Sequence, residues 1–268
     1  MKEKENLDVY FRGEKLYGDD FNLKQIKEWY NDEKEGYSGL DLANDSTYGF
    51  YRINYLNGFN KIKSVKEFNH VLSFGGAKGE ELNPIINKTK EVYIIEPSQK
   101  LRVKSISGKP VRYVTPMPSG KIDFKDNYFD LITCFGTLHH IPNVSFVLKE
   151  LFRVLKPGGY LLLREPIVSM GDWRKPRRGL TKRERGIPLG VFRKVIKENN
   201  VQIVSERKIL FPLLRRIDFG RYKGGNSNFW VNLDYILGIL FSWNNKYHSK
   251  GYLDKIRPQS VFYVLKKN

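Results

Sequence analysis

Short apolar runs and helix-forming stretches alternate along the chain from residue 71 to residue 267, and no other feature restricts the fold as strongly. Seven runs have the length and composition of strands: 71–74, 91–96, 111–115, 129–135, 160–165, 201–210 and 260–267. Helical patterns separate several of them: 79–88, a short turn after Ser98, 144–155 and 189–199. Because such chains join parallel strands through right-handed crossovers, we predict an α/β fold with a doubly wound, mostly parallel seven-stranded sheet and helices on both faces.

The helix at 144–155 illustrates how clear these patterns are. Its apolar residues recur at helical spacing on one face: Val147, Leu148, Leu151, Val154 and Leu155. We expect it to end at the KPGG segment, 156–159, because proline cannot continue a helix and glycine can turn the chain back.

A glycine-rich turn links the first strand to the first helix within VLSFGGAKGEEL, residues 71–82. Gly75, Gly76 and Gly79 suit a tight turn, because glycine adopts positive φ and lets a ligand approach the backbone. The helix that follows begins with unpaired backbone N–H groups. This succession of strand, turn and helix predicts a ligand site.

The spacing of the turn excludes two common nucleotide-binding motifs. A dinucleotide fingerprint needs glycine where Ala77 stands, and a phosphate-binding P-loop needs its lysine after the last glycine, whereas Lys78 precedes it. Glu80 and Glu81 would also compete with a phosphate for the start of the helix. Glu96 ends the second strand about 20 residues further on, where an acidic side chain of a doubly wound fold accepts hydrogen bonds from ribose hydroxyls. The ligand we expect is therefore adenosine-like and carries no phosphate beside the turn.

The composition bounds the partners and the chemistry. A formal net charge of +18 favours anionic partners, namely phosphorylated substrates, nucleic acid or an acidic membrane surface, with a solvated basic surface as the alternative. The single cysteine, Cys134, excludes an internal disulfide and a cysteine-based zinc site. No group of histidine and acidic residues stands at metal-ligand spacing, so we predict no required metal. The start, MKEKENLDVY, has no apolar stretch of the signal-peptide kind, and we expect a cytoplasmic protein.

Four segments in order carry a family resemblance: VLSFGGAKG, VYIIEPS, FKDNYFDLITCFGTLHHIPN and LKELFRVLKPGGYLLLREP. Together they resemble the class I S-adenosylmethionine-dependent methyltransferases, particularly the small-molecule, type 11-like group, over residues 68 to 210. The resemblance implies a Rossmann-like methyltransferase fold with S-adenosyl-L-methionine as cofactor. We accordingly expect a preamble at 1–67 packed as a cap on a methyltransferase domain at 68–268.

The resemblance also implies which residues contact the cofactor. They lie in the glycine turn, at the end of the second strand, in the turn after the third strand and after the fourth strand: Ser73, Gly75, Gly76, Ala77, Gly79, Glu96, Pro97, Met117, Pro118, Phe135 and Gly136. The chain departs from the family pattern in three places: the family usually has an acidic residue in place of Ser73, a glycine in place of Ala77, and often an acidic residue near Pro118 or Ser119 that contacts the adenine amine.

Methyl transfer from a sulfonium is an in-line displacement, so the protein needs no nucleophile, although a hydroxyl acceptor can require a base. His139 and His140 follow the fourth strand, and a neutral imidazole suits that task. We predict His139 as the base and His140 as a structural residue. Glu165 ends the fifth strand, where it could act as a base, accept a hydrogen bond from the substrate or pair with Arg174.

The loop at 171–186, which follows the fifth strand, holds seven basic residues between Arg174 and Arg185. We expect side chains of this loop, together with Thr137, to bind the acceptor and to grip a phosphate or carboxylate on it: Trp173, Arg174, Arg177 and Arg178. A solvated basic loop is the alternative interpretation.

An insertion at 211–259 precedes the last strand, and with the preamble it is where we expect acceptor choice to lie. Its most apolar part, residues 229–243, is too short and too polar to span a bilayer. We expect a helix that covers the sheet or forms a substrate lid, with contact to a membrane surface as a further possibility.

Our leading hypothesis is an enzyme that methylates a hydroxyl of a sugar, either nucleotide-linked or within a glycan, or of a similar small polar acceptor. One alternative is a nucleic-acid methyltransferase, which the net charge and stacking aromatics such as Tyr48, Tyr51 and Trp173 favour. Another is a degenerate methyltransferase fold that binds a partner without catalysis. The sequence leaves the oligomeric state open.

Overall fold

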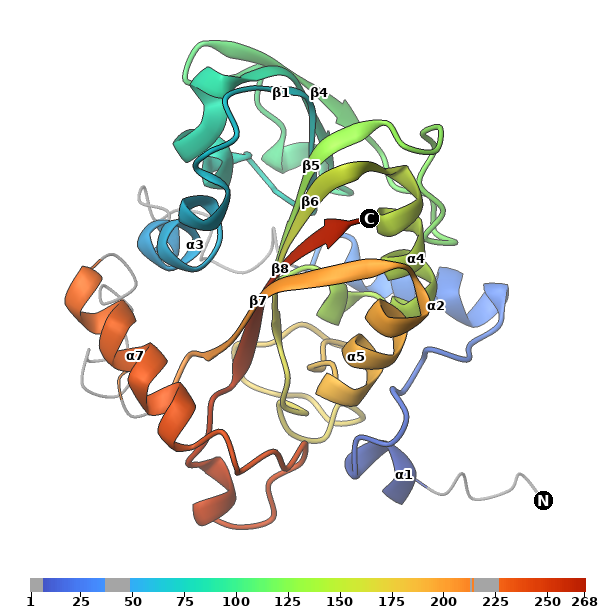
Figure 1. Ribbon diagram of the computed structural model, residues 1–268. Helices are drawn as coiled ribbons and strands as arrows, with labels where there is room; N and C mark the ends of the chain where they lie inside the picture. Colours follow the sequence, from blue (N-terminus) through green and yellow to red (C-terminus); the bar gives the residue numbers. More distant parts are fainter. Residues whose placement is uncertain (1–6, 37–48, 213, 215–226) are drawn as a thin grey trace.

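The computed structural model describes residues 7–36, 49–212, 214 and 227–268, and within them the strands form one open sheet (Figure 1). The strand order is β3-β4-β2-β1-β5-β6-β8-β7. The strands are β1 (Phe68–Phe74), β2 (Thr89–Ile95), β3 (Ser105–Ile106), β4 (Lys109–Val114), β5 (Phe129–Phe135), β6 (Leu155–Pro166), β7 (Val201–Ile209) and β8 (Ser260–Lys267). The predicted doubly wound α/β sheet is confirmed, with strands close to the seven expected segments.

Two details of the sheet differ from the prediction. An eighth strand, β3, forms an antiparallel hairpin with β4. Because β3 is only two residues long, it is too short to give a sequence pattern. The last strand, β8, runs antiparallel between β6 and β7, whereas β4, β2, β1, β5 and β6 are parallel to one another.

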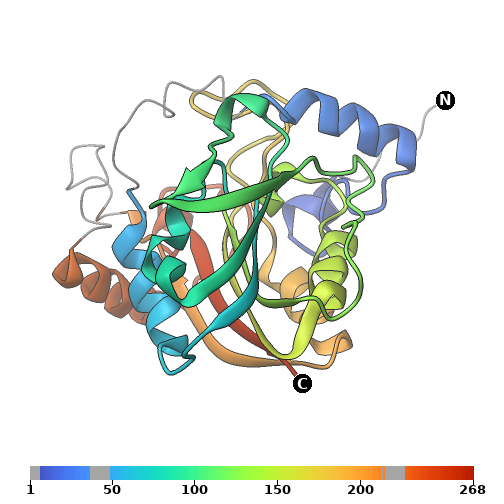
Figure 2. The ribbon, with the colours of Figure 1, turned by 90° about the horizontal axis from the view of Figure 1, so that it is seen from above.

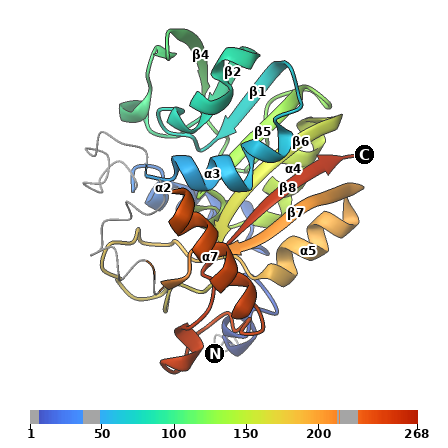
Figure 3. The ribbon, with the colours of Figure 1, turned by 60° about the vertical axis from the view of Figure 1, so that its left-hand side comes forward.

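Helices cover both faces of the sheet. The α-helices among the described residues are α1 (Asp8–Phe11), α2 (Leu23–Glu33), α3 (Tyr51–Asn57), α4 (Val144–Val154), α5 (Leu189–Glu198) and α7 (Asn228–Leu240). The short 3₁₀ helices are η2 (Phe59–Ile62), η3 (Glu80–Lys88), η4 (Gln99–Leu101), η5 (Leu138–His140) and η7 (Leu253–Lys255). Figure 1 shows α4 and α5 on one side of the sheet and α3 and α7 on the other, and Figure 3 shows α3 and α7 side by side.

Successive residues of each strand divide between two hydrophobic cores, because strand side chains alternate across a sheet. In β1, Leu72 packs in the core beneath α4 and α5, whereas Val71 packs in the core beneath α3 and η3. In β6, Leu161 and Leu163 join the first core and Leu162 the second. Burial on both faces explains why these strands are almost continuously apolar.

The segment predicted as a helix at 79–88 is a 3₁₀ helix, η3. Pro84 lies inside it and has no N–H to donate to an α-helical hydrogen bond. The predicted helix at 144–155 ends at Val154, as expected from the KPGG segment that follows.

The N-terminal segment lies beside the carboxyl ends of the strands. In Figure 2, α2 (blue) lies next to part of the 171–186 loop (yellow). Trp29 of α2 is 1% exposed and donates a hydrogen bond through Nε1 to the carbonyl oxygen of His140 at 2.8 Å. The helix therefore reaches the loop that follows β5. The boundary between a 1–67 cap and a 68–268 domain stays a prediction, and 37–48, 213 and 215–226 lie outside the described residues.

Candidate active site

A cavity of about 790 Å³ opens at the carboxyl ends of β1, β2, β4, β5 and β6. This size falls within the range of about 300 to 1,000 Å³ that is typical of small-ligand sites. Most of the residues that we predicted for the cofactor and for catalysis line it: Gly75, Gly76, Ala77, Glu96, Pro97, Met117, Pro118, Phe135, Gly136, Thr137, His139, His140 and Glu165. The other predicted site residues do not line it: Ser73, Gly79, Trp173, Arg174, Arg177 and Arg178.

The glycine turn is shaped by two close approaches. Gly75 has a φ of +70° and lies against the side chain of Thr137, so that a Cβ at this position would overlap it. Gly76 lies directly over Ser73 and the Glu81 carboxylate, which leave no room for a side chain. The turn therefore presents bare backbone to the cavity, as a closely approaching ligand requires.

Ser73 and Gly79 hold the turn from behind instead of lining the cavity. Ser73 is fully buried and donates a short hydrogen bond to Glu81. Gly79 has a φ of +73° at the start of η3 and packs against Ile106 and Ile94. Both residues support the turn and neither lines the cavity, so their predicted contact with the cofactor stays a prediction.

Ala77 takes the conformation that usually requires glycine. Its φ is +48°, which costs an L-residue about 1 to 2 kcal/mol. Two hydrogen bonds hold it there, from its N–H to Glu96 Oε2 at 3.1 Å and from the Tyr113 hydroxyl to its carbonyl at 2.8 Å. The turn keeps its shape although the glycine is absent.

Glu96 joins the turn to the end of β2. Its Oε1 accepts from the Ser98 N–H at 2.9 Å, and its Oε2 accepts from Ala77. Burial raises the pKa of this carboxyl above its ordinary value, although the two backbone N–H groups and Arg102 favour the charged form. Each carboxylate oxygen keeps a further lone pair, and Glu96 lines the cavity, so a pair of ribose hydroxyls could donate to it.

His139 and Glu165 form a hydrogen-bonded pair. His139 Nδ1 lies 2.8 Å from Glu165 Oε2, and the exposed fractions of the two side chains are 12% and 0%. Glu165 Oε1 accepts from the N–H groups of Thr137 at 2.7 Å and Leu138 at 2.8 Å. Burial, and secondarily the neighbouring His140, lower the pKa of His139 below its ordinary value, so the imidazole is neutral near pH 7.

Glu165 therefore lies behind His139. Of the roles considered for it, the pairing with Arg174 is wrong, because Arg174 binds Asp172 at 2.8 Å. A buried carboxylate that holds Nδ1 of an imidazole orients the ring and leaves Nε2 as the basic atom. Glu165 is thus a positioning residue for His139.

His140 belongs to a separate network that reaches into α2. Its Nδ1 lies 2.8 Å from Glu33 Oε2 and 3.2 Å from the Thr181 hydroxyl. Burial works against ionisation of Glu33, yet hydrogen bonds from His140 and Thr181 bring its pKa below the ordinary value. The structural role predicted for His140 fits this geometry.

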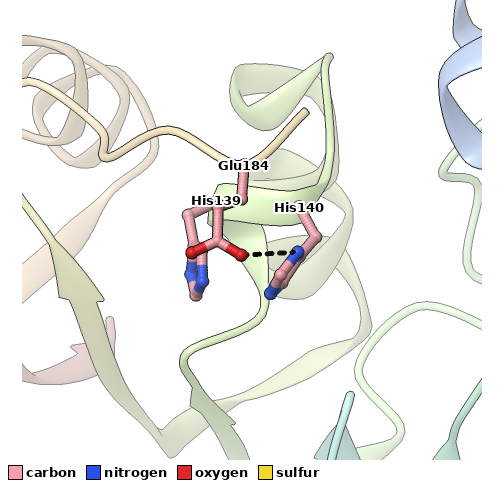
Figure 4. A group of neighbouring side chains, drawn as sticks. All are labelled: His139, His140 and Glu184. Atoms are coloured by element: carbon pink, nitrogen blue, oxygen red, sulfur yellow. Dashed lines mark ion pairs between the residues drawn. The ribbon is translucent and has the colours of Figure 1, made fainter. Parts of the chain in front are cut away.

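His139, His140 and Glu184 gather their donor atoms within 4.8 Å of one another, and Figure 4 shows the carboxylate between the two rings. These are metal-ligand residue types that the sequence did not bring together, because Glu184 comes from the 171–186 loop. One potential ligand atom of each residue already has a hydrogen-bond partner: His139 Nδ1 binds Glu165 and His140 Nδ1 binds Glu33. Glu184 accepts hydrogen bonds from the N–H and the hydroxyl of Thr181, both at 2.9 Å.

Because one donor atom of each residue is already bound by a neighbouring side chain, we expect EDTA to leave both turnover and the melting temperature unchanged. The measurement compares the protein before and after exhaustive dialysis against the chelator, with elemental analysis of the sample. Activity that falls on dialysis and returns with Zn²⁺ would show that the group binds a metal.

The 171–186 loop does not deliver its basic side chains to the cavity. Trp173 is 5% exposed and packs with Tyr10 and Tyr247, with its ring 4.6 Å from that of Phe11. Arg174 pairs with Asp172, Arg177 donates to backbone carbonyls of the loop, and Arg178 is exposed. Trp173 and these arginines thus lie outside the cavity lining, and their predicted contacts with the substrate stay a prediction.

Other basic residues of the loop fasten it to the N-terminal segment. Lys182 and Arg183 both bind Asp32 at 2.8 Å. Arg185 is fully buried and donates to the carbonyls of Tyr17, His139 and Pro142 at 3.0, 3.1 and 2.9 Å. Burial lowers its pKa to about 10, so it keeps its charge. These positive side chains therefore attach the loop to the N-terminal segment and to the turn after β5.

Sequence reasoning missed several charged residues that line the cavity, among them Glu81 and Arg164. Glu81 is buried, and burial raises its pKa to about 7. Arg164 is 7% exposed, its Cζ lies 3.9 Å from the ring centre of Phe50, and its Nε has no hydrogen-bond acceptor among the described residues. From the sequence, Glu81 counts only as a charge at the start of a helix and Arg164 only as a strand residue. The signal that could have drawn attention to Arg164 is the alternation of β6, which places it on the opposite face of the sheet from Glu165.

The strand order, the glycine turn and the cavity at the carboxyl ends of the strands are together typical of a methyltransferase. Residues 72–163 match the family that is described as a methyltransferase domain. Residues 72–163 therefore carry a class I S-adenosylmethionine-dependent methyltransferase domain, and S-adenosylmethionine is the cofactor of this class.

Among curated proteins, the chain is 32% identical over 137 residues to the ubiquinone/menaquinone biosynthesis C-methyltransferase UbiE of Erwinia tasmaniensis. That similarity covers 47% of this chain and 53% of UbiE, so the chain spans about half the length of the curated relatives it matches.

Among solved structures, the fold is similar to that of an S-adenosylmethionine dependent methyltransferase from Mesorhizobium loti, with a TM-score of 0.54, 13% identity and coverage of 80% of this chain and 97% of that one. It is equally similar to the [4+2]-cyclase SpnF, with a TM-score of 0.54, 14% identity and coverage of 92% of this chain and 97% of that one. At these identities the likeness concerns the fold alone.

Proposed function

We propose that this protein transfers a methyl group from S-adenosylmethionine to a hydroxyl of a small acceptor, with a sugar as the acceptor class to test first. The observation that carries the proposal is one cavity that joins the Glu96 turn to the His139–Glu165 pair. A cofactor half and a base therefore share one enclosed space, which a simple binding protein would not need.

The residues around the glycine turn suit a zwitterionic cofactor. Glu96 would accept the ribose hydroxyls, and the turn's backbone would allow close approach. Beside the turn, Glu81 offers a carboxylate and Arg164 a guanidinium, which match the α-ammonium and α-carboxylate of a methionine group. Glu81 would then supply the negative charge that the family usually places at Ser73.

Because burial sets the pKa of Glu81 at about 7, ligand binding should be linked to its ionisation. An ammonium group stabilises the carboxylate, so we expect S-adenosylhomocysteine binding at pH 7 to release a proton and affinity to rise with pH across that value. Calorimetry in two buffers of different ionisation enthalpy measures the release. Glu81→Gln should abolish the buffer dependence; equal enthalpies for the unaltered protein in both buffers would remove Glu81 from the site.

The chemistry at the acceptor would depend on His139. The bound cofactor supplies an electrophilic methyl group, and the protein must align the acceptor and take up its proton. A neutral His139, oriented by Glu165, is suited to accept a proton from a hydroxyl through Nε2. Apolar residues dominate the rest of that part of the cavity and exclude water: Phe50, Ile141, Val168, Met170 and Phe211.

A second candidate is methylation at carbon, which the similarity to the C-methyltransferase UbiE favours. The same base could deprotonate a phenol or enol and so activate a neighbouring carbon. The apolar lining suits an aromatic acceptor at least as well as a sugar. For the nucleic-acid hypothesis, Trp173 is buried in a packed cluster and cannot stack on a base, whereas Tyr51 is exposed. Tyr48 lies outside the described residues.

The test uses methyl-labelled S-adenosylmethionine with three acceptor panels: sugars and nucleotide sugars, phenols and quinols, and single-stranded RNA. Mass spectrometry and NMR of the product then distinguish O-methyl from C-methyl. We expect labelled product from the sugar panel. Product from the phenol panel alone would establish the second candidate. S-adenosylhomocysteine binding without product in any panel would oppose both, and absence of that binding would favour a degenerate domain.

A further inference from the structure

Helix α7 is apolar on the side that faces solvent as well as on the side that faces the protein. Val231, Asp234 and Gly238 form its buried side, against β7 and α3. Its outer side exposes large apolar residues: Phe229 (67%), Ile236 (51%), Ile239 (53%) and Leu240 (61%). A surface helix of a soluble domain normally presents polar residues outward, so this side is built for contact with something apolar.

The chain beyond α7 extends the same surface. Trp243 is 74% exposed, and next to it Asn244 donates from Nδ2 to the carbonyls of Leu253 and Ile256 at 3.2 and 3.1 Å. These bonds hold the η7 region against the end of α7, where Tyr252 and Leu253 are 86% and 79% exposed. We define the α7 surface as Phe229, Ile236, Ile239, Leu240, Trp243, Tyr252, Leu253 and Ile256.

Lysines flank this surface. Lys246, Lys250 and Lys255 are exposed in the segment that carries Trp243 and Tyr252. Their acidic neighbour Asp254 pairs with Lys246 at 2.6 Å and accepts from the Lys250 N–H. Local charge is thus positive, in a chain whose formal net charge is +18.

We propose that the α7 surface binds a membrane containing anionic phospholipids, with α7 lying in the plane of the interface. Aromatic rings with a polar edge, aliphatic side chains and flanking lysines together form the composition of an interfacial helix. None of the described helices is long and apolar enough to cross a bilayer. A second copy of the chain fits less well, because it would bring the same positive flank, whereas an anionic membrane complements these lysines. This inference is independent of the proposed function.

The same helix supports one wall of the cavity. Asp234 accepts hydrogen bonds from the N–H groups of Leu210 and Phe211 at 2.8 and 2.7 Å, and both of these residues line the cavity. The membrane-binding helix and the acceptor part of the site are therefore linked through one buried side chain.

The test measures partition of the full chain into vesicles of phosphatidylcholine alone and of phosphatidylcholine with one quarter phosphatidylglycerol, by co-sedimentation and Trp fluorescence. We expect binding to the anionic vesicles that is at least tenfold stronger, that weakens with salt and that shifts the emission to the blue. The triple variant Ile236→Gln, Leu240→Gln and Trp243→Gln should reduce this binding at least tenfold.

Two controls keep the outcome interpretable. Leu23→Gln and Phe146→Gln change residues that are 52% and 45% exposed outside the α7 surface, and they should bind like the unaltered chain. Melting curves establish that each variant is folded. No partition of the folded chain, equal partition into both vesicle types, or an unaffected triple variant would overturn the proposal. If the unaltered chain forms a dimer that the triple variant does not form, and the unaltered chain does not bind vesicles, the surface would be assigned to a second copy of the chain.

Discussion

Replacing His139 with alanine is expected to lower kcat by about 10²- to 10⁴-fold while leaving S-adenosylhomocysteine affinity unchanged, the loss that accompanies removal of a general base. The affinity should persist because His139 is held by Glu165, whereas the cofactor contacts proposed for the turn belong to Glu96 and Glu81. The measurement is steady-state turnover with the acceptor identified by the panels, alongside calorimetric titration.

The pH profile separates a base from a merely structural residue. A base must be unprotonated, so turnover should fall as pH drops through the pKa of His139, which burial holds below the ordinary histidine value of about 6.5. Glu165 favours the protonated form, so Glu165→Gln should move this acidic limb to lower pH as well as reduce the rate. His70→Ala, which alters a histidine that does not line the cavity, serves as control. Full turnover in His139→Ala would mean that transfer needs no base from this residue.

Glu96→Ala should raise the dissociation constant for S-adenosylhomocysteine by at least about tenfold. Loss of a charged hydrogen-bond partner costs about 1.5 to 3 kcal/mol, and about 1.4 kcal/mol corresponds to tenfold. The substitution also frees the N–H groups of Ala77 and Ser98, so the turn loses part of its shape.

The matched control for that variant is Glu91→Ala. Glu91 belongs to the same strand, but it is at the other end and pairs with Arg112 at 3.0 Å outside the cavity. Equal affinities of the Glu96 variant and the unaltered protein would place the ribose elsewhere. A loss common to both variants would indicate damage to β2 and no specific role for Glu96.

Patterns within single elements could be predicted from the sequence. Apolar runs predicted the strands, and the spacing from the glycine turn predicted that Glu96 would lie beside that turn, because both patterns depend on residues near one another in the chain. The contact of these residues with the cofactor stays a prediction. The orientation of β8 could not be predicted, since an antiparallel strand buried on both faces has the same apolar composition as a parallel one.

Contacts between distant segments could not be predicted. The basic loop suggested an anion grip, yet Asp32 and backbone carbonyls bind Lys182, Arg183 and Arg185, and nothing local to the loop identifies those partners. Glu81 was considered only for its charge at a helix start, because its hydrogen bond to Ser73 forms after the turn folds. Charge alone does not tell whether a residue faces a ligand or another part of the chain.

The attachment of the basic loop to α2 has an evolutionary consequence. Glu33 binds both His140 and the Thr181 hydroxyl, so the N-terminal segment, the turn after β5 and the loop share one set of hydrogen bonds. A chimaera that exchanges only one of these segments with a relative would leave buried partners mismatched. Segments 7–36 and 171–186 must therefore diversify together, and new acceptor preferences should arise through paired changes in both while the cofactor half stays as it is.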